Sequence, residues 1–220
     1  MNQEIDLLKF YPKSNRPIEE RGKLIKETDR ARARKFDIDY FDGDRLTGYG
    51  GYSYNERFWK DTVQYIKEVY NLTNDSKILD VGCAKGFMMN DLSQLIPKAE
   101  ILGVDISNYA INNSIESMSN NISYANANNL PFDDNYFDLV ISINTLHNLP
   151  LIDCKEAFRE INRVSSKDSF VMNDAWVDES GKEAMLKWNL TALTYMSTNS
   201  WKELFKEVGY KGDFYWFFAA

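Results

Sequence analysis

Between residues 77 and 175, short apolar segments alternate with segments of helical pattern, and this alternation limits the fold more than any other feature. We expect strands at the apolar segments, which span 77–81, 100–106, 122–126, 137–144 and 168–175. Helices are expected between them at 87–96, after the N-cap residue Ser107, and at 151–165. Alternating strands and helices with short connections are typical of a parallel sheet with helices on both faces. The predicted fold class is therefore α/β, a doubly wound and mostly parallel sheet.

The segments outside this alternation predict additions to one compact domain. Residues 18–36 are charged with sparse apolar positions and predict a solvated helix, and the aromatic, glycine-rich residues 37–59 predict an ordered loop. Further elements are expected as helices at 55–70, 180–196 and 199–208 and as an aromatic strand at 213–218.

These additions fix the expected organisation of the chain. The N-terminal helices and a glycine- and tyrosine-rich lid segment occupy 1–75, and the sheet-containing core occupies 76–220 with a helical insertion near 178–197. With only one strand after the insertion, we expect six strands, or a last sheet edge supplied by another subunit. A homodimer is therefore a possible assembly.

Charge and cysteine usage exclude several classes of protein. A formal net charge of -7 argues against a general nucleic-acid binder, which needs a basic face. No apolar stretch approaches the roughly 18 residues of a membrane span, and the N-terminus lacks the apolar region of a secretory signal. Cys83 and Cys154 give neither a disulfide framework nor metal-ligand spacing. We therefore expect a cytoplasmic protein without a nucleic-acid partner, a membrane partner or a bound metal.

The stretch ILDVGCAKGFMMNDL joins a strand to a helix through a glycine-containing loop. Gly82 and Gly86 let a ligand approach the backbone closely, beside the start of a helix. The spacing is not the G-x-G-x-x-G of dinucleotide-binding proteins, and Asp80 at the turn would repel a pyrophosphate. Asp105 ends the next strand, where doubly wound folds hold a carboxylate that binds ribose hydroxyls. The pattern predicts an adenosine-type ligand without phosphates, and it argues against a dinucleotide oxidoreductase.

These motifs resemble those of the class I S-adenosylmethionine-dependent methyltransferases. LDVGCAKG is similar to their D-x-G-x-G-x-G motif with Ala84 at the middle glycine, and GVDIS is similar to their ribose-binding motif. NANNLPFDDNYFDLVISINTLHNL resembles the adenine-contacting stretch of the small-molecule branch, which includes quinone methyltransferases. The resemblance covers 77–174. It implies a Rossmann-like fold with S-adenosyl-L-methionine as cofactor and S-adenosyl-L-homocysteine as product.

The resemblance assigns the methionine and ribose contacts to the loop. Gly82, Cys83, Ala84 and Gly86 should lie against the cofactor, with Asp80 behind them. Ala84 leaves open a decayed loop, and the position of Cys83 leaves open a redox or nucleophilic role.

It assigns the nucleoside contacts to the following segments. Asp105 should bind the ribose diol and Ile106 should pack on the adenine. Asn126 stands where many relatives have an aspartate that accepts from the adenine amino group, and Ala127 should offer a backbone contact. Asn144 should meet the cofactor's ammonium through its carbonyl.

His147 is the only histidine in the chain, and it follows the fourth expected strand. Ligands bind at the carboxyl ends of strands in open parallel sheets, so His147 should lie where the acceptor meets the methyl group. We hypothesise that it is the general base of an O-methyltransferase. The alternative is that it caps local backbone or orients the acceptor. Asp174, after the fifth strand, is the other candidate base or orienting group.

The tyrosine-rich segment is expected to close the cofactor site. Tyr49 and Tyr52 are predicted to contact the cofactor, through their rings or hydroxyls. Tyr54 is assigned to the substrate, and Arg57 or Arg45 is expected to bind an anionic group. The alternative is an aromatic patch packed on the sheet edge.

The insertion is expected to build the acceptor pocket. Trp176 and Trp188 are predicted to line it, together with Asn189 and Tyr195. Packing in the core or at an interface is the alternative for these aromatic residues.

The sequence therefore predicts methyl transfer to a small-molecule acceptor. The most specific interpretation is transfer to a hydroxyl, for which a sugar or sugar precursor is one candidate acceptor, with His147 as base. A protein or peptide methyltransferase, an N-methyltransferase that relies on proximity alone, and a non-catalytic cofactor-binding subunit remain alternatives.

Overall fold

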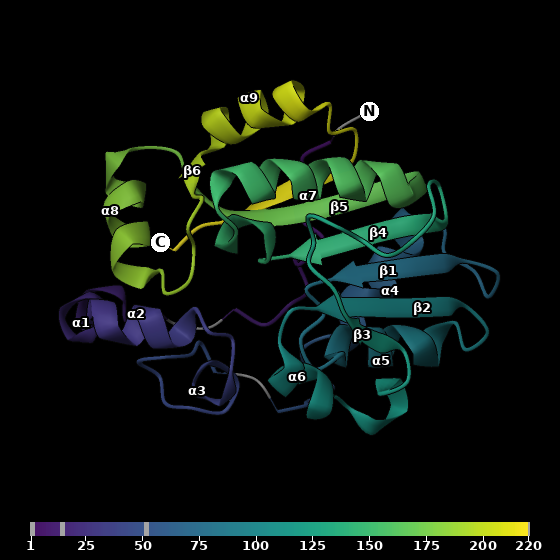
Figure 1. The fold of residues 1–220 in the computed structure, drawn as a ribbon, viewed down its shortest axis with the longest axis horizontal. Helices are drawn as coiled ribbons and strands as arrows, with labels where there is room; N and C mark the ends of the chain where they lie inside the picture. The colour runs from purple at the N-terminus through teal and green to yellow at the C-terminus, as the bar shows by residue number, and fades with distance from the viewer. Residues whose placement is uncertain (1–2, 14–15, 51–52, 220) are drawn as a thin grey trace.

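A twisted, seven-stranded sheet forms the centre of the computed structural model, which describes residues 3–13, 16–50 and 53–219 (Figure 1). Its strands are β1 (Lys77–Val81), β2 (Glu100–Asp105), β3 (Ile122–Tyr124), β4 (Phe137–Ile143), β5 (Ser165–Trp176), β6 (Met196–Ser197) and β7 (Asp213–Phe217). The order is β3-β2-β1-β4-β5-β6, with β7 also paired to β5, and every pairing of these strands is parallel. The predicted fold class is confirmed.

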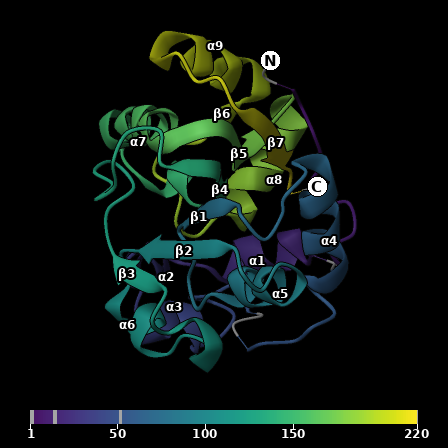
Figure 2. The ribbon, with the colours of Figure 1, turned by 90° about the vertical axis from the view of Figure 1, so that its right-hand side faces the viewer.

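Helices cover both faces of this sheet. They are α1 (Ile18–Leu24), α2 (Glu27–Ala33), α3 (Ile38–Phe41), α4 (Lys60–Val69), α5 (Phe87–Leu95), α6 (Asn108–Asn112), α7 (Leu151–Val164), α8 (Glu179–Trp188) and α9 (Thr198–Val208), with short 3₁₀ turns at Glu116–Met118 and Leu146–Asn148. The apolar sides of α7 and α9 pack on one face of the sheet, and those of α4 and α5 pack on the other (Figure 2). Successive residues of β5 alternate between these two cores, because strand side chains alternate in direction. Phe170 belongs to one core and Val171 to the other.

The prediction of one solvated helix over 18–36 is wrong. The helix is interrupted at Ile25, which is buried, and the two short helices that replace it lie against α8 and the segment after it. Arg21 explains the packing, because its guanidinium is buried and donates to three backbone carbonyls, those of Arg45 (2.8 Å), Trp188 (3.2 Å) and Gly48 (3.4 Å). A charged residue thus faces inward, which a count of apolar positions does not predict.

The helix predicted at 180–196 ends earlier, at Trp188. The residues after it find backbone partners outside a helix: the Leu190 amide donates to the Tyr49 hydroxyl, and the amides of Leu193 and Thr194 donate to the His147 carbonyl. The segment from 189 to 195 is therefore irregular, with bends at 190–191 and 193–194, and it lies beside the carboxyl end of β4.

The last sheet edge is covered by the chain's own N-terminal segment. The Phe214 amide donates to the Gln3 carbonyl and the Ile5 amide donates to the Phe214 carbonyl, both at 2.9 Å, which is a parallel pairing. The sheet has seven strands where six were expected, because β6 is an additional short strand. The N-terminal segment, and not another subunit, pairs with the outer edge of β7. The edge of β7 needs no second subunit at these positions.

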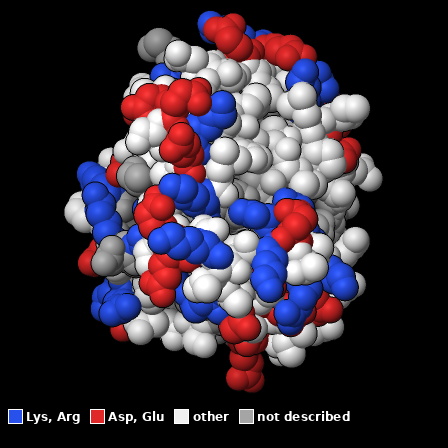
Figure 3. Space-filling view, turned by 90° about the vertical axis from the view of Figure 1, so that its left-hand side faces the viewer, with Lys and Arg blue, Asp and Glu red and all other residues white. Residues whose placement is uncertain are grey.

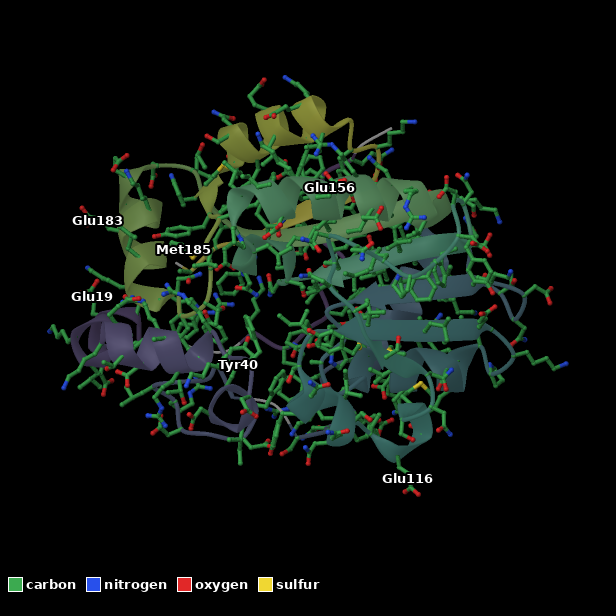
Figure 4. The ribbon with its side chains drawn as sticks, viewed as in Figure 1. Glu19, Tyr40, Glu116, Glu156, Glu183 and Met185 are labelled. Carbon is green, nitrogen blue, oxygen red and sulfur yellow. The ribbon has the colours of Figure 1, made fainter. Side chains whose placement is uncertain are left out.

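The segment from 16 to 50 lies over the carboxyl ends of the strands. Figure 4 shows Tyr40 on the side of this segment that faces the sheet. The Lys85 ammonium, in the loop after β1, contacts both oxygens of Asp42 at 2.7 and 2.9 Å, and the Tyr109 hydroxyl donates to the same carboxylate at 2.6 Å. These bonds fix the N-terminal segment to the glycine loop and to α6.

Candidate active site

A cavity of about 520 Å³ lies between this N-terminal segment and the carboxyl ends of β1, β2, β4 and β5. One end is formed by the glycine loop after β1 and the residues after β2. The other end is formed by residues after β4, by the last residues of β5 and β7, and by residues of and after α8. Ligands of open parallel sheets bind at this position, so we treat the cavity as the candidate active site.

The glycine loop has the tight backbone that the sequence predicts. Gly82 (φ 83°) and Gly86 (φ 77°) adopt the left-handed conformation, and a Cβ at Gly82 would overlap the side chain of Thr145. Ala84 adopts the same region with φ 50°. Its amide donates to Asp105 at 2.8 Å, which holds the strained residue in place. The alanine therefore keeps the loop's shape, and the loop has not decayed.

Two carboxylates lie beside this loop, that of Asp80 buried and that of Asp105 half-buried. Asp80 is 6% exposed and makes no hydrogen bond or ion pair with the described residues. Burial, with the charge of Asp105 as a smaller cause, raises its pKa to about 8. Burial also raises the pKa of Asp105, although amide donors from Ala84 and Ser107 oppose this. A cationic ligand would stabilise the ionised form of these carboxyl groups, which burial disfavours, so the site suits a cation.

The other predicted cofactor residues of the core also line the cavity. They are Cys83, Ile106, Asn126, Ala127 and Asn144. Burial raises the pKa of the Cys83 thiol well above its usual value, which disfavours the thiolate needed for a nucleophilic role. The carbonyl of Asn144 accepts from the Asn148 side chain at 3.2 Å.

His147 and Asp174 come together at the far end of the cavity. Both are buried, and His147 Nε2 lies 3.6 Å from Asp174 Oδ2. The Asp174 amide donates to His147 Nδ1 at 3.2 Å, so the neutral imidazole carries its proton on Nε2, facing the carboxylate. Burial lowers the pKa of His147, against the effect of Asp174, and burial raises the pKa of Asp174.

The Asp174 carboxylate is hydrogen-bonded through one of its two oxygens. Asn189 Nδ2 donates to Oδ2 at 2.6 Å, while Oδ1 has no hydrogen-bond partner in the described part of the chain. The side chain lines the cavity and is 6% exposed. A buried carboxylate oxygen with free acceptor capacity is suited to binding a hydroxyl or amine of a substrate.

Some of the predicted lid residues line the cavity and others do not. Tyr49 lines the cavity, but its hydroxyl accepts from the Leu190 amide at 2.8 Å. Tyr52 lies outside the described residues. Tyr54 does not line the cavity, because its hydroxyl donates to Asp91 on α5 at 2.6 Å. Arg57 is exposed and lies over the Phe58 ring, away from the lining.

The insertion contributes one of its two predicted tryptophans. Trp188 lines the cavity and is 6% exposed. Trp176 does not, and its ring packs edge-on against Tyr195 at 5.7 Å. For Trp176, the packing alternative describes the structure better than the pocket-lining one.

The sequence does not predict several of the residues that line the cavity. Phe36, Tyr40 and Phe41 face the nucleoside end of the cavity, and Arg16 and Thr191 face the acceptor end. These residues belong to no local motif. The only sequence signal for the three aromatic residues is the aromatic content of the N-terminal segment, since their place depends on how that segment folds over the sheet.

Charged groups elsewhere form no obvious ion site. No cluster of three or more potential metal ligands occurs within residues 3–13, 16–50 and 53–219. No helix of the described chain is long and apolar enough to cross a membrane. On the face that carries α1, α2 and α8, acidic and basic side chains are interspersed (Figure 3).

The glycine loop and the residues after β2 fit S-adenosylmethionine, the cofactor that the sequence resemblance implies. A Cβ at Gly82 would overlap the side chain of Thr145, so glycine is required for the tight turn of the loop beside the cavity. The carboxylate of Asp80 lacks a cationic partner, and Asp105 retains acceptor capacity for hydroxyl groups.

Comparisons with known proteins agree with this fit. A family model described as a methyltransferase domain matches residues 79–172. Malonyl-[acyl-carrier protein] O-methyltransferase of Legionella pneumophila is 28% identical over 66% of this chain and 49% of that protein. Ubiquinone/menaquinone biosynthesis C-methyltransferase of Shewanella baltica is 34% identical over 49% of this chain and 44% of that protein.

The fold has relatives among solved structures. A phosphoethanolamine N-methyltransferase of Haemonchus contortus, in complex with S-adenosylhomocysteine, is similar with a TM-score of 0.57 and 18% identity, over 80% of this chain and 44% of that one. The chain spans about half the length of the curated relatives named above. The matched domain, the sheet order and the loop with its two carboxylates identify residues 79–172 as a methyltransferase domain of the class I, S-adenosylmethionine-dependent type.

Proposed function

We propose that this protein transfers a methyl group from S-adenosylmethionine to a hydroxyl group of a small molecule. One observation carries the proposal: a single cavity joins the glycine loop and its unpaired carboxylate to the buried His147–Asp174 pair. The first end suits a cationic nucleoside, and the second end suits a group that must lose a proton.

The residues of the first end divide the cofactor between them in this proposal. Asp105 would accept hydrogen bonds from the ribose hydroxyls, and Asp80 would neutralise the ammonium group. Ile106, which is 39% exposed, offers an apolar surface to the adenine. When bound, the cofactor supplies an electrophilic methyl group on a sulfonium.

At the second end, the geometry favours the alternative in which Asp174, and not His147, is the base. His147 Nδ1 faces the backbone amide of Asp174, so that nitrogen is not directed at an acceptor. The carboxylate has one oxygen beside His147 Nε2 and the other free. We therefore favour Asp174 Oδ1 as the atom that takes the proton, with His147 as the residue that positions and polarises the carboxylate. Burial supports this role, since a carboxylate with a raised pKa is a stronger base.

The size and walls of the cavity support a small acceptor. Pockets of about 300–1,000 Å³ hold one drug-sized ligand, and here 520 Å³ must hold both cofactor and acceptor. Tyr49, Trp188 and Phe217 supply aromatic walls near Asp174. Aromatic rings bind the apolar faces of sugars, so a sugar or sugar precursor fits the hydroxyl proposal.

Substitution of the pair tests the proposed chemistry. We expect Asp174→Asn and His147→Ala each to lower turnover by about 100-fold or more, because a positioned base contributes about 10²- to 10⁴-fold. The dissociation constant of S-adenosylhomocysteine should change by less than about twofold, since neither residue lies at the glycine loop. Calorimetry and turnover of labelled cofactor measure the two quantities.

The pH profile separates a base from a structural support. Wild-type turnover should rise with pH through the pKa of the pair, and Asp174→Asn should lose that dependence. Asp133→Asn is a matched control, because Asp133 is exposed and lies outside the cavity. Near-full activity of both His147→Ala and Asp174→Asn would contradict the proposed mechanism and favour transfer by proximity alone.

A further inference from the structure

We propose that the acceptor is an anion, and that Arg16 binds its carboxylate or phosphate group while Asp174 binds the hydroxyl to be methylated. This inference rests on the proposed function, because it names the class of acceptor for the same cavity. It concerns a residue that no sequence motif contains.

Arg16 presents unused donors to the cavity. Its Nη1 donates to the Phe218 carbonyl at 3.1 Å, whereas Nε and Nη2 make no hydrogen bond with the described residues. The guanidinium lies over the Phe217 ring at 4.4 Å and near the Trp188 ring at 5.9 Å. These ring contacts and the bond to the Phe218 carbonyl restrict the position of the guanidinium group. A fixed guanidinium with two free donors matches a carboxylate or phosphate.

The order of the strands places Arg16 away from the cofactor. The glycine loop follows β1, His147 follows β4, Asp174 lies in β5, and Arg16 contacts Phe217 and Phe218 at the end of β7. Neighbouring strands lie about 4.8 Å apart, so three steps from β1 to β7 cross about 14 Å. Arg16 is therefore on the acceptor side of the His147–Asp174 pair, beyond the glycine loop that would hold the methionine group.

Arg16 and Asp174 are near one another without forming an ion pair. Their charges interact, since Asp174 opposes the lowering of the Arg16 pKa by burial, but no nitrogen–oxygen contact within 4 Å joins them. A gap between a half-buried cation and a buried carboxylate leaves room for a bifunctional ligand. A hydroxyl group can donate to Asp174 Oδ1 while an acid group on the same molecule binds Arg16. An uncharged acceptor would leave the cation without a full partner.

Binding of small anions tests this assignment directly. The protein is loaded with S-adenosylhomocysteine and titrated with malonate, inorganic phosphate or uncharged glycerol, with tryptophan fluorescence as the signal because Trp188 lies beside Arg16. We expect malonate or phosphate to bind and glycerol not to bind. Arg16→Gln should weaken anion binding by about tenfold or more, and Arg16→Lys should weaken it less. Arg57→Gln is the matched control, because Arg57 is exposed and outside the cavity.

The affinity for S-adenosylhomocysteine distinguishes an acceptor site from a cofactor site. We expect Arg16→Gln and Arg16→Lys to bind it within about twofold of wild type. A loss of about tenfold in both would assign Arg16 to the cofactor and overturn the inference. Equal anion binding by wild type and Arg16→Gln would also overturn it, as would no anion binding by wild type.

The charge of the product separates failure of this inference from failure of the proposed function. Methyl-labelled small molecules formed in a cell extract are passed over an anion-exchange column at neutral pH. Retention of the labelled product supports the inference. Passage in the unbound fraction refutes an anionic acceptor and leaves methyl transfer to a small molecule intact. Absence of any labelled small molecule counts against the proposed function itself, and the anion titration then decides the role of Arg16 alone.

Discussion

Ala84 has the backbone conformation of a glycine without being one. A left-handed backbone costs a residue with a Cβ about 1–2 kcal/mol, and the bond from its amide to Asp105 keeps the residue in that conformation. The sequence predicts the loop correctly because its neighbours Gly82 and Gly86 are intact. The motif alone would indicate that an alanine at the middle glycine position disrupts the loop, whereas the structure shows the loop intact.

Asp80 gives a pH-dependent prediction at the same scale. Its pKa is about 8 in the folded, ligand-free protein and about 3.9 in an unfolded chain. Between these values the folded state binds more protons than the unfolded state, so this carboxyl group makes stability fall as pH rises. Asp80→Asn removes the effect. We expect the variant to have a higher melting temperature than wild type near about pH 8, and a smaller advantage near about pH 5.

Differential scanning fluorimetry of the ligand-free proteins measures this difference. A melting temperature of Asp80→Asn at or below that of wild type at the higher pH would show that the buried charge carries no such cost. The same variant should bind S-adenosylhomocysteine more weakly, because it lacks the carboxylate that we propose neutralises the ammonium group.

At the scale of elements, two arginines attach the N-terminal helices to α8. Arg21 donates to the Trp188 carbonyl, and Arg30 donates to the carbonyls of Leu186 (3.0 Å) and Asn189 (3.1 Å). Carbonyl groups at the end of a helix lack partners within it and carry partial negative charge, which favours cations. The sequence pattern suggested a solvated helix here because it cannot show which carbonyl groups lie opposite a charged side chain.

Arg21 is therefore the residue whose loss should open the site. We expect Arg21→Met to speed proteolytic cleavage within 16–50 and to weaken S-adenosylhomocysteine binding by about tenfold, since three carbonyl groups lose their donor at once. Limited proteolysis and calorimetry measure these effects. Arg32→Met is the matched control, because the Arg32 guanidinium is exposed and, among the described residues, its hydrogen bonds go to the Asp39 side chain alone. Similar behaviour of the two variants would refute the role of Arg21.

At the scale of the whole molecule, the sequence predicts what is local and misses what depends on distant packing. The strands from β1 to β5 and the acidic residues Asp80 and Asp105 follow from patterns of a few residues, and the structure places them as expected. Tyr54 was assigned to the substrate, but the nearby carboxylate of Asp91 on α5 holds it outside the cavity. Arg16 reaches the site only because the N-terminal segment crosses the sheet, which no local pattern reveals.

The N-terminal segment also covers the β7 edge of the sheet. Residues 3–5 pair with β7, and the segment that follows them leads toward Arg16 and the cavity. One stretch of chain thus covers a sheet edge and supplies the acceptor end of the site. The division into an N-terminal part and a core describes the sequence well, but the two parts form the cavity together.

The most direct test of the central claim is to follow a labelled methyl group. The protein is incubated with methyl-labelled S-adenosylmethionine and a cell extract, and the products are separated by size. The proposed function predicts label in the small-molecule fraction, and predicts that Asp174→Asn reduces it by about 100-fold. Label confined to macromolecules, or equal labelling by wild type and Asp174→Asn, would contradict a small-molecule methyltransferase that works through this pair.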